Sequence, residues 1–176
     1  MHHDLDEDFR AAAVACLDGL YGFALALSRD RGAAEDLVQE TYVRALAARR
    51  RASPGENLRG WLFTILRNIW KNERRRRRPE AVDDVDSIAT APGVADPETA
   101  LDRRELRERL SQALDGLPGP FREVVMLRCV LGFSYQEVAG IVGCPAGTVM
   151  SRLARARAQL RRSLDATNGA GPGGSA

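Results

Sequence analysis

FSYQEVAGIVGCPAGTVMSRLARARAQLRR, residues 133–162, holds two helical patterns on either side of a Gly-Cys-Pro break. Ser134 and Glu137 have the spacing of a capping box at the start of the first helix. Gly143 can adopt the left-handed conformation that ends this helix, and Pro145 suits the start of the next one. This arrangement predicts a helix-turn-helix.

The second helix of this stretch has an apolar back and a basic front. Its apolar residues recur at three- and four-residue steps and so share one face: Val149, Leu153, Ala156 and Leu160. Ser151, Arg152 and Arg155 fall on the opposite face. Such a helix fits the major groove of DNA, where arginine can bond the guanine edge and other basic groups meet phosphates. A solvated helix in an ordinary bundle is the alternative, but the cap, the turn and the basic front together favour DNA binding.

Charge is distributed unevenly along the 176 residues, although the formal net charge is only +2. Residues 1–48 carry nine acidic and four basic side chains, whereas residues 49–78 carry eleven basic and two acidic ones. Residues 79–102 hold seven acidic and no basic side chains, and residues 121–165 hold seven basic and three acidic ones. Two basic segments separated by an acidic one indicate two DNA-facing modules.

Helical periodicity and its breaks predict an all-α fold of two small helical domains joined by a flexible acidic linker. Before the helix-turn-helix, helices are expected at residues 9–28, 33–50, 58–78, 100–117 and 121–131. The linker has no helical period and is rich in Asp, Ala and Pro. The predicted boundaries are a first domain at 1–78, the linker at 79–99, a C-terminal helix-turn-helix domain at 100–166 and a disordered tail at 167–176.

The apolar stripes of the first three helices identify the expected core. They comprise Val14, Leu17, Leu20, Tyr21, Ala24 and Leu27, then Leu37, Val38, Tyr42, Ala45 and Leu46, then Trp61, Leu62, Ile65, Leu66 and Ile69. Asn57 is expected to cap the third helix. The cysteines Cys16, Cys129 and Cys144 have no metal-ligand spacing and lie among apolar residues, so we expect small buried hydrophobic side chains.

Two polar features of the first domain have both an ordinary and a functional explanation. The outer face of the second helix carries Asp36, Gln39, Glu40 and Arg44, and such a face is usually only solvated. The third helix interleaves basic and aromatic residues and ends in the five-arginine run 74–78, a composition that suits single-stranded nucleic acid. For Trp61, burial in the core explains the residue at least as well as base contact does.

Three motifs, taken in order, resemble the bacterial extracytoplasmic-function (ECF) sigma factors of the sigma-70 family. They are EDLVQETYVRAL (35–46), NLRGWLFTILRN (57–68) and LPGPFREVVMLRCVLGFSYQEVAGIVGCPAGTVMSRLARARAQL (117–160). The resemblance covers nearly all of residues 9–164. It implies a promoter-specificity subunit that directs transcription initiation by RNA polymerase, a role that in this family is tied to stress response.

The resemblance also implies roles for individual residues. Asp36, Gln39, Glu40 and Arg44 would dock on the β′ clamp helices of core polymerase, whose β subunit is a further expected partner. The −10 promoter element would be read as a melted strand by Ala48, Arg49, Ala52, Asn57, Trp61, Arg67, Asn68 and Lys71. The −35 element would be read as duplex by Thr148, Met150, Ser151, Arg152 and Arg155. An anti-sigma factor wedged between the two domains is the expected regulator.

Two positions depart from the family pattern. Many members carry an aromatic residue near Ala52, whereas this loop carries arginines at 49–51. Many also place Lys or Arg directly after the Gly-Thr-Val sequence, where this chain has Met150. A contact by Met150 would be apolar, for instance to a thymine methyl group, or it would be absent.

Several classes of function lack support in the sequence. No nucleophile–base pair, metal-ligand cluster or phosphate-binding loop is visible, so we expect no enzyme activity, cofactor or metal. No signal peptide or apolar run of membrane length is present, which predicts a cytoplasmic protein without membrane insertion. Three alternatives to a sigma factor stay open. They are a helix-turn-helix transcriptional regulator that acts without polymerase, a helical adaptor for acidic proteins and a thiol-switched protein.

Overall fold

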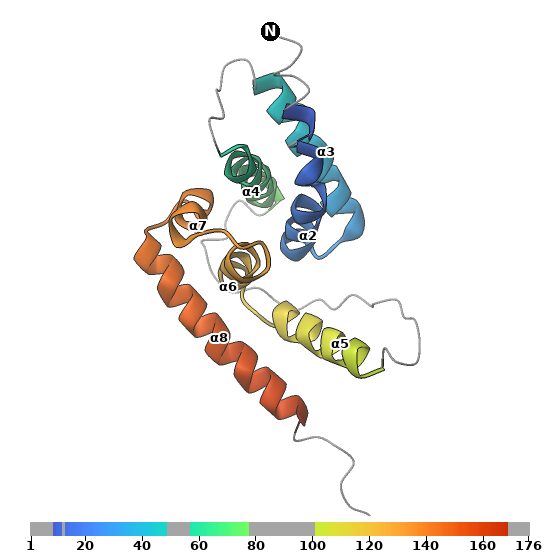
Figure 1. Ribbon diagram of the computed structural model, residues 1–176, viewed down its shortest axis with the longest axis vertical. Helices are drawn as coiled ribbons and strands as arrows, with labels where there is room; N and C mark the ends of the chain where they lie inside the picture. Colours follow the sequence, from blue (N-terminus) through green and yellow to red (C-terminus); the bar gives the residue numbers. More distant parts are fainter. Residues whose placement is uncertain (1–8, 12, 49–56, 78–100, 169–176) are drawn as a thin grey trace, which may run out of the picture.

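The structure is a computed structural model that describes residues 9–11, 13–48, 57–77 and 101–168, with side chains except at 101–107 and 166–168. These residues form helices joined by short turns, and no strand occurs among them (Figure 1). The predicted all-α fold is confirmed. We call the described residues up to 77 the N-terminal unit and residues 101–168 the C-terminal unit.

Three long helices make up most of the N-terminal unit. They are α2 (Leu17–Ser28), α3 (Arg31–Ala48) and α4 (Leu58–Arg77), preceded by the short helix Phe9–Ala15. Each packs on the other two, and the contact between α2 and α3 is the most extensive. The largest side chains between them are fully buried: Leu20, Phe23, Leu37, Leu62, Phe63 and Leu66. Most residues of the three expected apolar stripes are buried in the core or packed against it.

Side-chain caps fix where α3 and α4 begin. The Asp30 carboxylate accepts a hydrogen bond from the Ala33 N–H at 2.7 Å, and Asn57 Oδ1 accepts one from the Gly60 N–H at 2.8 Å. Both bonds satisfy amide groups that have no partner within the first turn of a helix. The prediction that Asn57 caps its helix is confirmed.

The C-terminal unit places α8 (Ala146–Asn168) against α5 (Leu101–Asp115), α6 (Gly119–Val125) and α7 (Tyr135–Val142). α6 continues directly into η1, a π-helical turn at Met126–Val130. α6 begins two residues earlier than expected because Pro120 lies in its first turn, where a missing N–H costs nothing.

The predicted helix-turn-helix is formed by α7 and α8. Ser134 caps α7, and both hydrogen bonds of its capping box with Glu137 are present. Gly143 ends α7 in the left-handed conformation, with φ 66° and ψ 42°. α8 runs on to Asn168, past the arginines that end the predicted motif.

Three apolar residues expected in the core are exposed: Val14 by 69%, Leu17 by 44% and Leu46 by 44%. The helix expected over residues 9–28 is interrupted at Cys16, and its two parts are bent by 48°. An apolar stripe cannot stay on one face across such a bend. In the last turns of α3 it is Ala45, not Leu46, that is fully buried.

The expectation of buried cysteines is wrong for Cys129, which is exposed, whereas Cys16 and Cys144 are partly buried. Cys129 lies in η1, and its neighbour Val130 is 60% exposed. A π-helical turn takes more residues than an α-helical one. The α-helical period therefore fails at this point, and Cys129 faces solvent instead of the core.

The two units pack against each other and share one hydrophobic core. α4 lies beside α7, and α2 lies beside α6 (Figure 1). At the centre, the Phe63 ring lies 5.6 Å from the Phe23 ring and 5.0 Å from the Phe133 ring, measured between centroids. The sequence did not predict this packing. The expected linker at 79–99 lies outside the described residues. The expectation of a disordered tail at 167–176 is wrong for residues 167 and 168, which belong to α8, and the rest of that tail lies outside the described residues.

Membrane-spanning potential is limited to one pair of elements in the described part of the chain. No single helix there is long and apolar enough to cross a bilayer, whereas Phe9–Ala15 and Leu17–Ser28 meet the length and composition test only when taken together.

Candidate nucleic-acid and protein interfaces

The polar face of α8 is the first candidate interface. On its back, three side chains pack against the rest of the C-terminal unit and are at most 2% exposed: Val149, Leu153 and Ala156. The predicted −35 residues Met150, Ser151 and Arg155 are exposed, and Thr148 and Arg152 are partly exposed. Met150 is 51% exposed, so the residue that departs from the family pattern lies open on this face. α8 thus has the packed back and open polar front that a groove-binding helix needs.

The capping box of α7 holds the helix-turn-helix together at its start. The Ser134 N–H donates to Glu137 Oε2 at 2.8 Å, and the Glu137 N–H donates to Ser134 Oγ at 3.2 Å. The hydrogen bond from the Ser134 backbone is the main reason that the pKa of Glu137 lies below its usual value, with a further contribution from the Ser134 side chain. Asn57 of the N-terminal unit also donates to this carboxylate, at 3.3 Å.

The charged form of Glu137 stabilises the fold, so the protein is expected to become less stable when acid protonates this side chain. Because its folded-state pKa is lowered, its contribution is present above the ordinary value of 4.5 and is lost as the pH falls through the folded-state pKa. Glu137→Gln keeps an acceptor for the cap but removes the charge, so its stability should change less with pH below about 5 than that of the wild type. Urea midpoints measured from neutral pH down to about pH 3 test this, with the exposed Glu35→Gln as control. An unchanged pH slope in Glu137→Gln would contradict the assignment.

The predicted −10 residues lie on α4 and at the end of α3, and they differ in accessibility. Asn68 is exposed, while Lys71 and Trp61 are partly buried. Trp61 packs against the hydrophobic core, which agrees with the explanation of this residue as part of the core. Ala48 is the last residue of α3. Arg49 and Ala52 lie outside the described residues.

Arg67 of α4 is not free, although the helical pattern placed it outside the apolar stripe. Its Nε lies 2.6 Å from Glu123 Oε1 of α6, and the two side chains are only 15% and 10% exposed. Sequence reasoning missed this ion pair because its partners are 56 residues apart and belong to different units.

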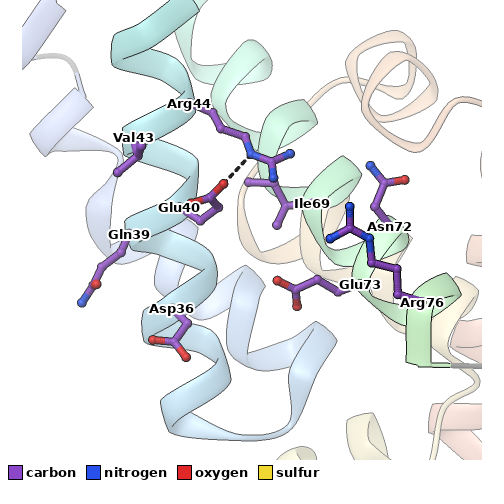
Figure 2. A pocket seen from close by; sticks show the side chains of 9 residues that line it. All are labelled: Asp36, Gln39, Glu40, Val43, Arg44, Ile69, Asn72, Glu73 and Arg76. Atoms are coloured by element: carbon purple, nitrogen blue, oxygen red, sulfur yellow. Dashed lines mark hydrogen bonds and ion pairs between the residues drawn. The ribbon is translucent and has the colours of Figure 1, made fainter.

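A groove between α3 and α4 is the second candidate interface (Figure 2). It encloses about 530 Å³ and is lined by all four residues predicted to bind polymerase. Glu40 and Arg44 form an ion pair there at 2.6 Å, with both side chains about half exposed. The remaining lining residues were not predicted: Val43, Ile69, Asn72, Glu73 and Arg76. The sequence gives no sign that those on α4 belong to this groove, because only the packing of α4 on α3 brings them there.

In the part of the chain that the structure describes, no group of three or more His, Cys, Asp or Glu side chains could hold a metal ion.

Two family models match separate parts of the chain. Sigma-70 region 2 matches residues 14–80, and sigma-70 region 4 matches residues 107–160. The first match contains α3 and α4, and the second contains α6 to α7 and most of α8.

Two similar proteins can be aligned with most of the chain. The ECF RNA polymerase sigma factor EcfG of Rhodopseudomonas palustris is 42% identical over 161 residues, which cover 91% of this chain and 87% of EcfG. The ECF RNA polymerase sigma-E factor of Escherichia coli is 34% identical over 136 residues, which cover 72% of this chain and 71% of that factor.

Two solved structures have a similar fold. The sigma factor RpoE of Bartonella quintana, solved with the anti-sigma factor NepR, has a TM-score of 0.71 and 34% identity, covering 90% of this chain and 98% of RpoE. CnrH, solved with the cytosolic domain of CnrY, has a TM-score of 0.66 and 28% identity, covering 92% of this chain and 90% of CnrH.

Proposed function

This chain belongs to the ECF sigma factors of the sigma-70 family, and we propose that it binds core RNA polymerase through the α3–α4 groove and promoter DNA at two places. As a sigma factor it directs transcription initiation and carries no catalytic step of its own. The observation that carries the proposal is the pair of open polar surfaces, one on each unit. Polymerase would supply the chemistry, and this chain would supply the choice of promoter.

The groove between α3 and α4 is the proposed polymerase-docking site, on the β′ clamp helices. Its acidic and amide side chains, Asp36, Gln39 and Glu40, line one wall, where they can accept hydrogen bonds from a helical partner. Charged surfaces of this kind steer association and fix which partner binds.

The two units would hold the promoter at two points. α8 would enter the major groove of the −35 duplex with Ser151, Arg152 and Arg155 toward the bases and phosphates. α4 would hold the melted −10 strand through Asn68 and Lys71, with nearby aromatic and basic residues following the backbone. The boundary between the modules is proposed to fall at residues 79–99, where the acidic linker is expected.

An anti-sigma factor is the proposed regulator. Support comes from the two solved relatives, RpoE of B. quintana with NepR and CnrH with the cytosolic domain of CnrY, each of which covers at least 90% of this chain. The exposed apolar residues Val14 and Leu17 offer additional surface for a protein partner.

Reconstitution with core polymerase tests the proposal. The purified chain should bind core polymerase in a pull-down, and the resulting holoenzyme should start transcription at discrete sites on a genomic DNA library. A chain that binds duplex DNA but not polymerase would instead be a polymerase-independent helix-turn-helix regulator. Salt-dependent binding that is also sequence-selective would exclude a helical adaptor for acidic proteins.

Arg155→Ala is expected to relax −35 selectivity. If Arg155 bonds a guanine edge, its loss should cost about 1–3 kcal/mol at the preferred base and little at others. Holoenzyme binding to duplexes that vary at each −35 position measures this difference. Arg161→Ala, also exposed on α8, is the control and should weaken binding uniformly if it meets only phosphate. Unchanged base preference in Arg155→Ala would reduce Arg155 to a phosphate contact or a solvated side chain.

A further inference from the structure

One apolar side chain interrupts the polar front of α8. Among the side chains of α8 that the structure describes, Met150 is the only large apolar one that is exposed. The back of this helix is already closed by Val149 and Leu153, so the core does not require an apolar side chain at position 150. An exposed methionine gains hydrophobic free energy only when a partner covers it. Met150 therefore marks a place on α8 where an apolar group of a partner would fit.

Small residues on either side leave Met150 accessible. Gly147 lies one turn before it and Ala154 one turn after it, so the three residues form a row along the helix. All three are exposed. Apart from its chain neighbours and the helix backbone, no atom lies within 4 Å of the place that a Cβ would take at Gly147. A DNA duplex can therefore approach this row closely, and the methionine is the one long side chain that projects from it.

A polar row runs beside the apolar one. It consists of Thr148, Ser151 and Arg155, which follow the same three- and four-residue steps. Ser151 Oγ donates a hydrogen bond to the Thr148 carbonyl at 3.0 Å, which uses the only hydrogen of this hydroxyl and leaves its lone pairs to accept. Met150 and Ser151 thus offer no side-chain donor to a base, whereas Arg155, one turn later, offers several.

This combination of side chains suits thymine and does not suit guanine. In the major groove guanine shows only the acceptors N7 and O6, which would lie against Met150 and Ser151 without a donor. The C5-methyl group of thymine is the apolar feature of this groove, and it gives up no hydrogen bond when a methionine covers it. The thioether side chain is flexible and polarisable, so it can adapt its shape to that methyl group.

We propose that Met150 selects a thymine in the −35 duplex by packing on its C5-methyl group. The inference rests on the proposed function, since it requires α8 to lie in the major groove, and it adds the base that one residue reads. Burial of a single methyl group corresponds to about a fourfold change in affinity. Arg155 lies more than one turn further along α8, so it meets a different base pair or a phosphate.

Replacing thymine by deoxyuridine tests the contact because it removes only the C5-methyl group. The probe is a promoter duplex taken from a start site that the holoenzyme uses on the genomic library, with each −35 thymine of both strands replaced in turn. One replacement should weaken binding of the wild-type holoenzyme about fourfold. Met150→Ala should bind the thymine and deoxyuridine duplexes equally at that position. Met150→Leu, which keeps a large apolar side chain, should still prefer thymine.

Val130→Ala is the matched control for loss of an exposed apolar side chain. Val130 is 60% exposed and belongs to η1 of the same unit, so its replacement should leave the preference for thymine unchanged. Met150 is 51% exposed and alanine is a strong helix former, so the fold of Met150→Ala should be intact. The inference would be overturned by a −35 element without thymine, by a wild type insensitive to every deoxyuridine, or by equal sensitivity of the wild type and Met150→Ala.

Salt dependence separates an apolar contact from a phosphate contact. Met150→Ala should lower affinity for the promoter without changing the slope of log affinity against log salt, because an apolar contact releases no counterion. Arg161→Ala should reduce that slope by about 1 if this arginine meets a phosphate. A changed slope in Met150→Ala would contradict packing on a methyl group.

The wild-type chain separates failure of this inference from failure of the proposed function. If it neither binds core polymerase nor directs transcription from discrete sites, the proposed function fails and the inference fails with it. If it directs transcription but tolerates deoxyuridine throughout the −35 element, only the assignment of Met150 fails. If the preference for thymine is present in the wild type and Met150→Leu and absent in Met150→Ala, both proposals stand.

Discussion

Asp36→Lys combined with Glu40→Lys should reduce binding to core polymerase about 100-fold and abolish promoter-directed transcription. Both carboxylates line the α3–α4 groove, which also contains Glu73, Arg44 and Arg76. The double change turns the net charge of the groove from negative to positive and releases Arg44 from its ion pair with Glu40. Like charges brought together at an interface cost several kcal/mol, so the loss should exceed that of removing the carboxylates alone.

The fold of the double variant should remain intact because neither carboxylate is part of the core. Asp36 is exposed and Glu40 partly so, and surface changes of this kind usually alter stability by less than about 0.5 kcal/mol. Glu35→Lys is the matched control, since Glu35 is an exposed acidic residue of the same helix outside the groove. A titration of labelled chain with core polymerase measures the change. If Glu35→Lys weakens binding as much as the double variant does, the groove is not the docking site.

Local sequence signals were sufficient for the helix-turn-helix. The capping box of Ser134 and Glu137 and the left-handed Gly143 involve only neighbouring residues, and all of them occur as predicted. The buried back of α8 follows from simple periodicity for the same reason. Features that depend on contacts within one or two helical turns can be read from the sequence, because no distant partner decides them.

Positions where the period of the chain changes were predicted less well. The bend at Cys16 leaves Val14 and Leu17 exposed, and the π-helical turn at Met126–Val130 exposes Cys129. A regular α-helical period assigns each residue to a face on the assumption that the helix is straight and uniform. This period cannot predict a break that lies inside an otherwise continuous helical pattern.

Contacts between the two units could not be predicted at all. Only the structure shows that Phe63 lies between Phe23 and Phe133. The partners of Arg67 and Asn57 lie 56 and 80 residues further along the chain. A charged or polar residue that the sequence predicts to be solvated or to face DNA can therefore be bound by another part of the protein.

Arg122→Met should lower the free energy of unfolding by about 3 kcal/mol. Arg122 is only 5% exposed. A buried arginine usually pairs with a carboxylate, but Arg122 forms no such ion pair within the described residues. Its guanidinium instead donates to the carbonyl oxygens of Ala26 and Leu114, near the ends of α2 and α5, at 3.0 Å each, and to that of Leu117, in the turn after α5, at 2.6 Å. The last carbonyls of a helix lack partners and carry partial negative charge, so a buried cation is stabilised there.

Methionine matches the length of the arginine side chain but donates no hydrogen bond. The buried carbonyl of Leu117 would then lose this donor, whereas that of Leu114 would keep the Leu117 N–H at 3.1 Å. A buried acceptor that loses its donor costs more than an average hydrogen bond contributes. Because Ala26 belongs to the N-terminal unit, the change should also weaken the contact between the units. Arg122→Lys should recover part of the stability, since its single ammonium group cannot reach every carbonyl that the fork of arginine reaches.

Urea unfolding followed by circular dichroism provides the measurement. Arg161→Met, at an exposed position of α8, should stay within about 0.5 kcal/mol of the wild type. A loss of less than about 1 kcal/mol in Arg122→Met would mean that water replaces the guanidinium at the carbonyls. A loss of about 3 kcal/mol of unfolding free energy in Arg122→Met, partly restored in Arg122→Lys, would identify Arg122 as the shared cap that joins the ends of α2 and α5.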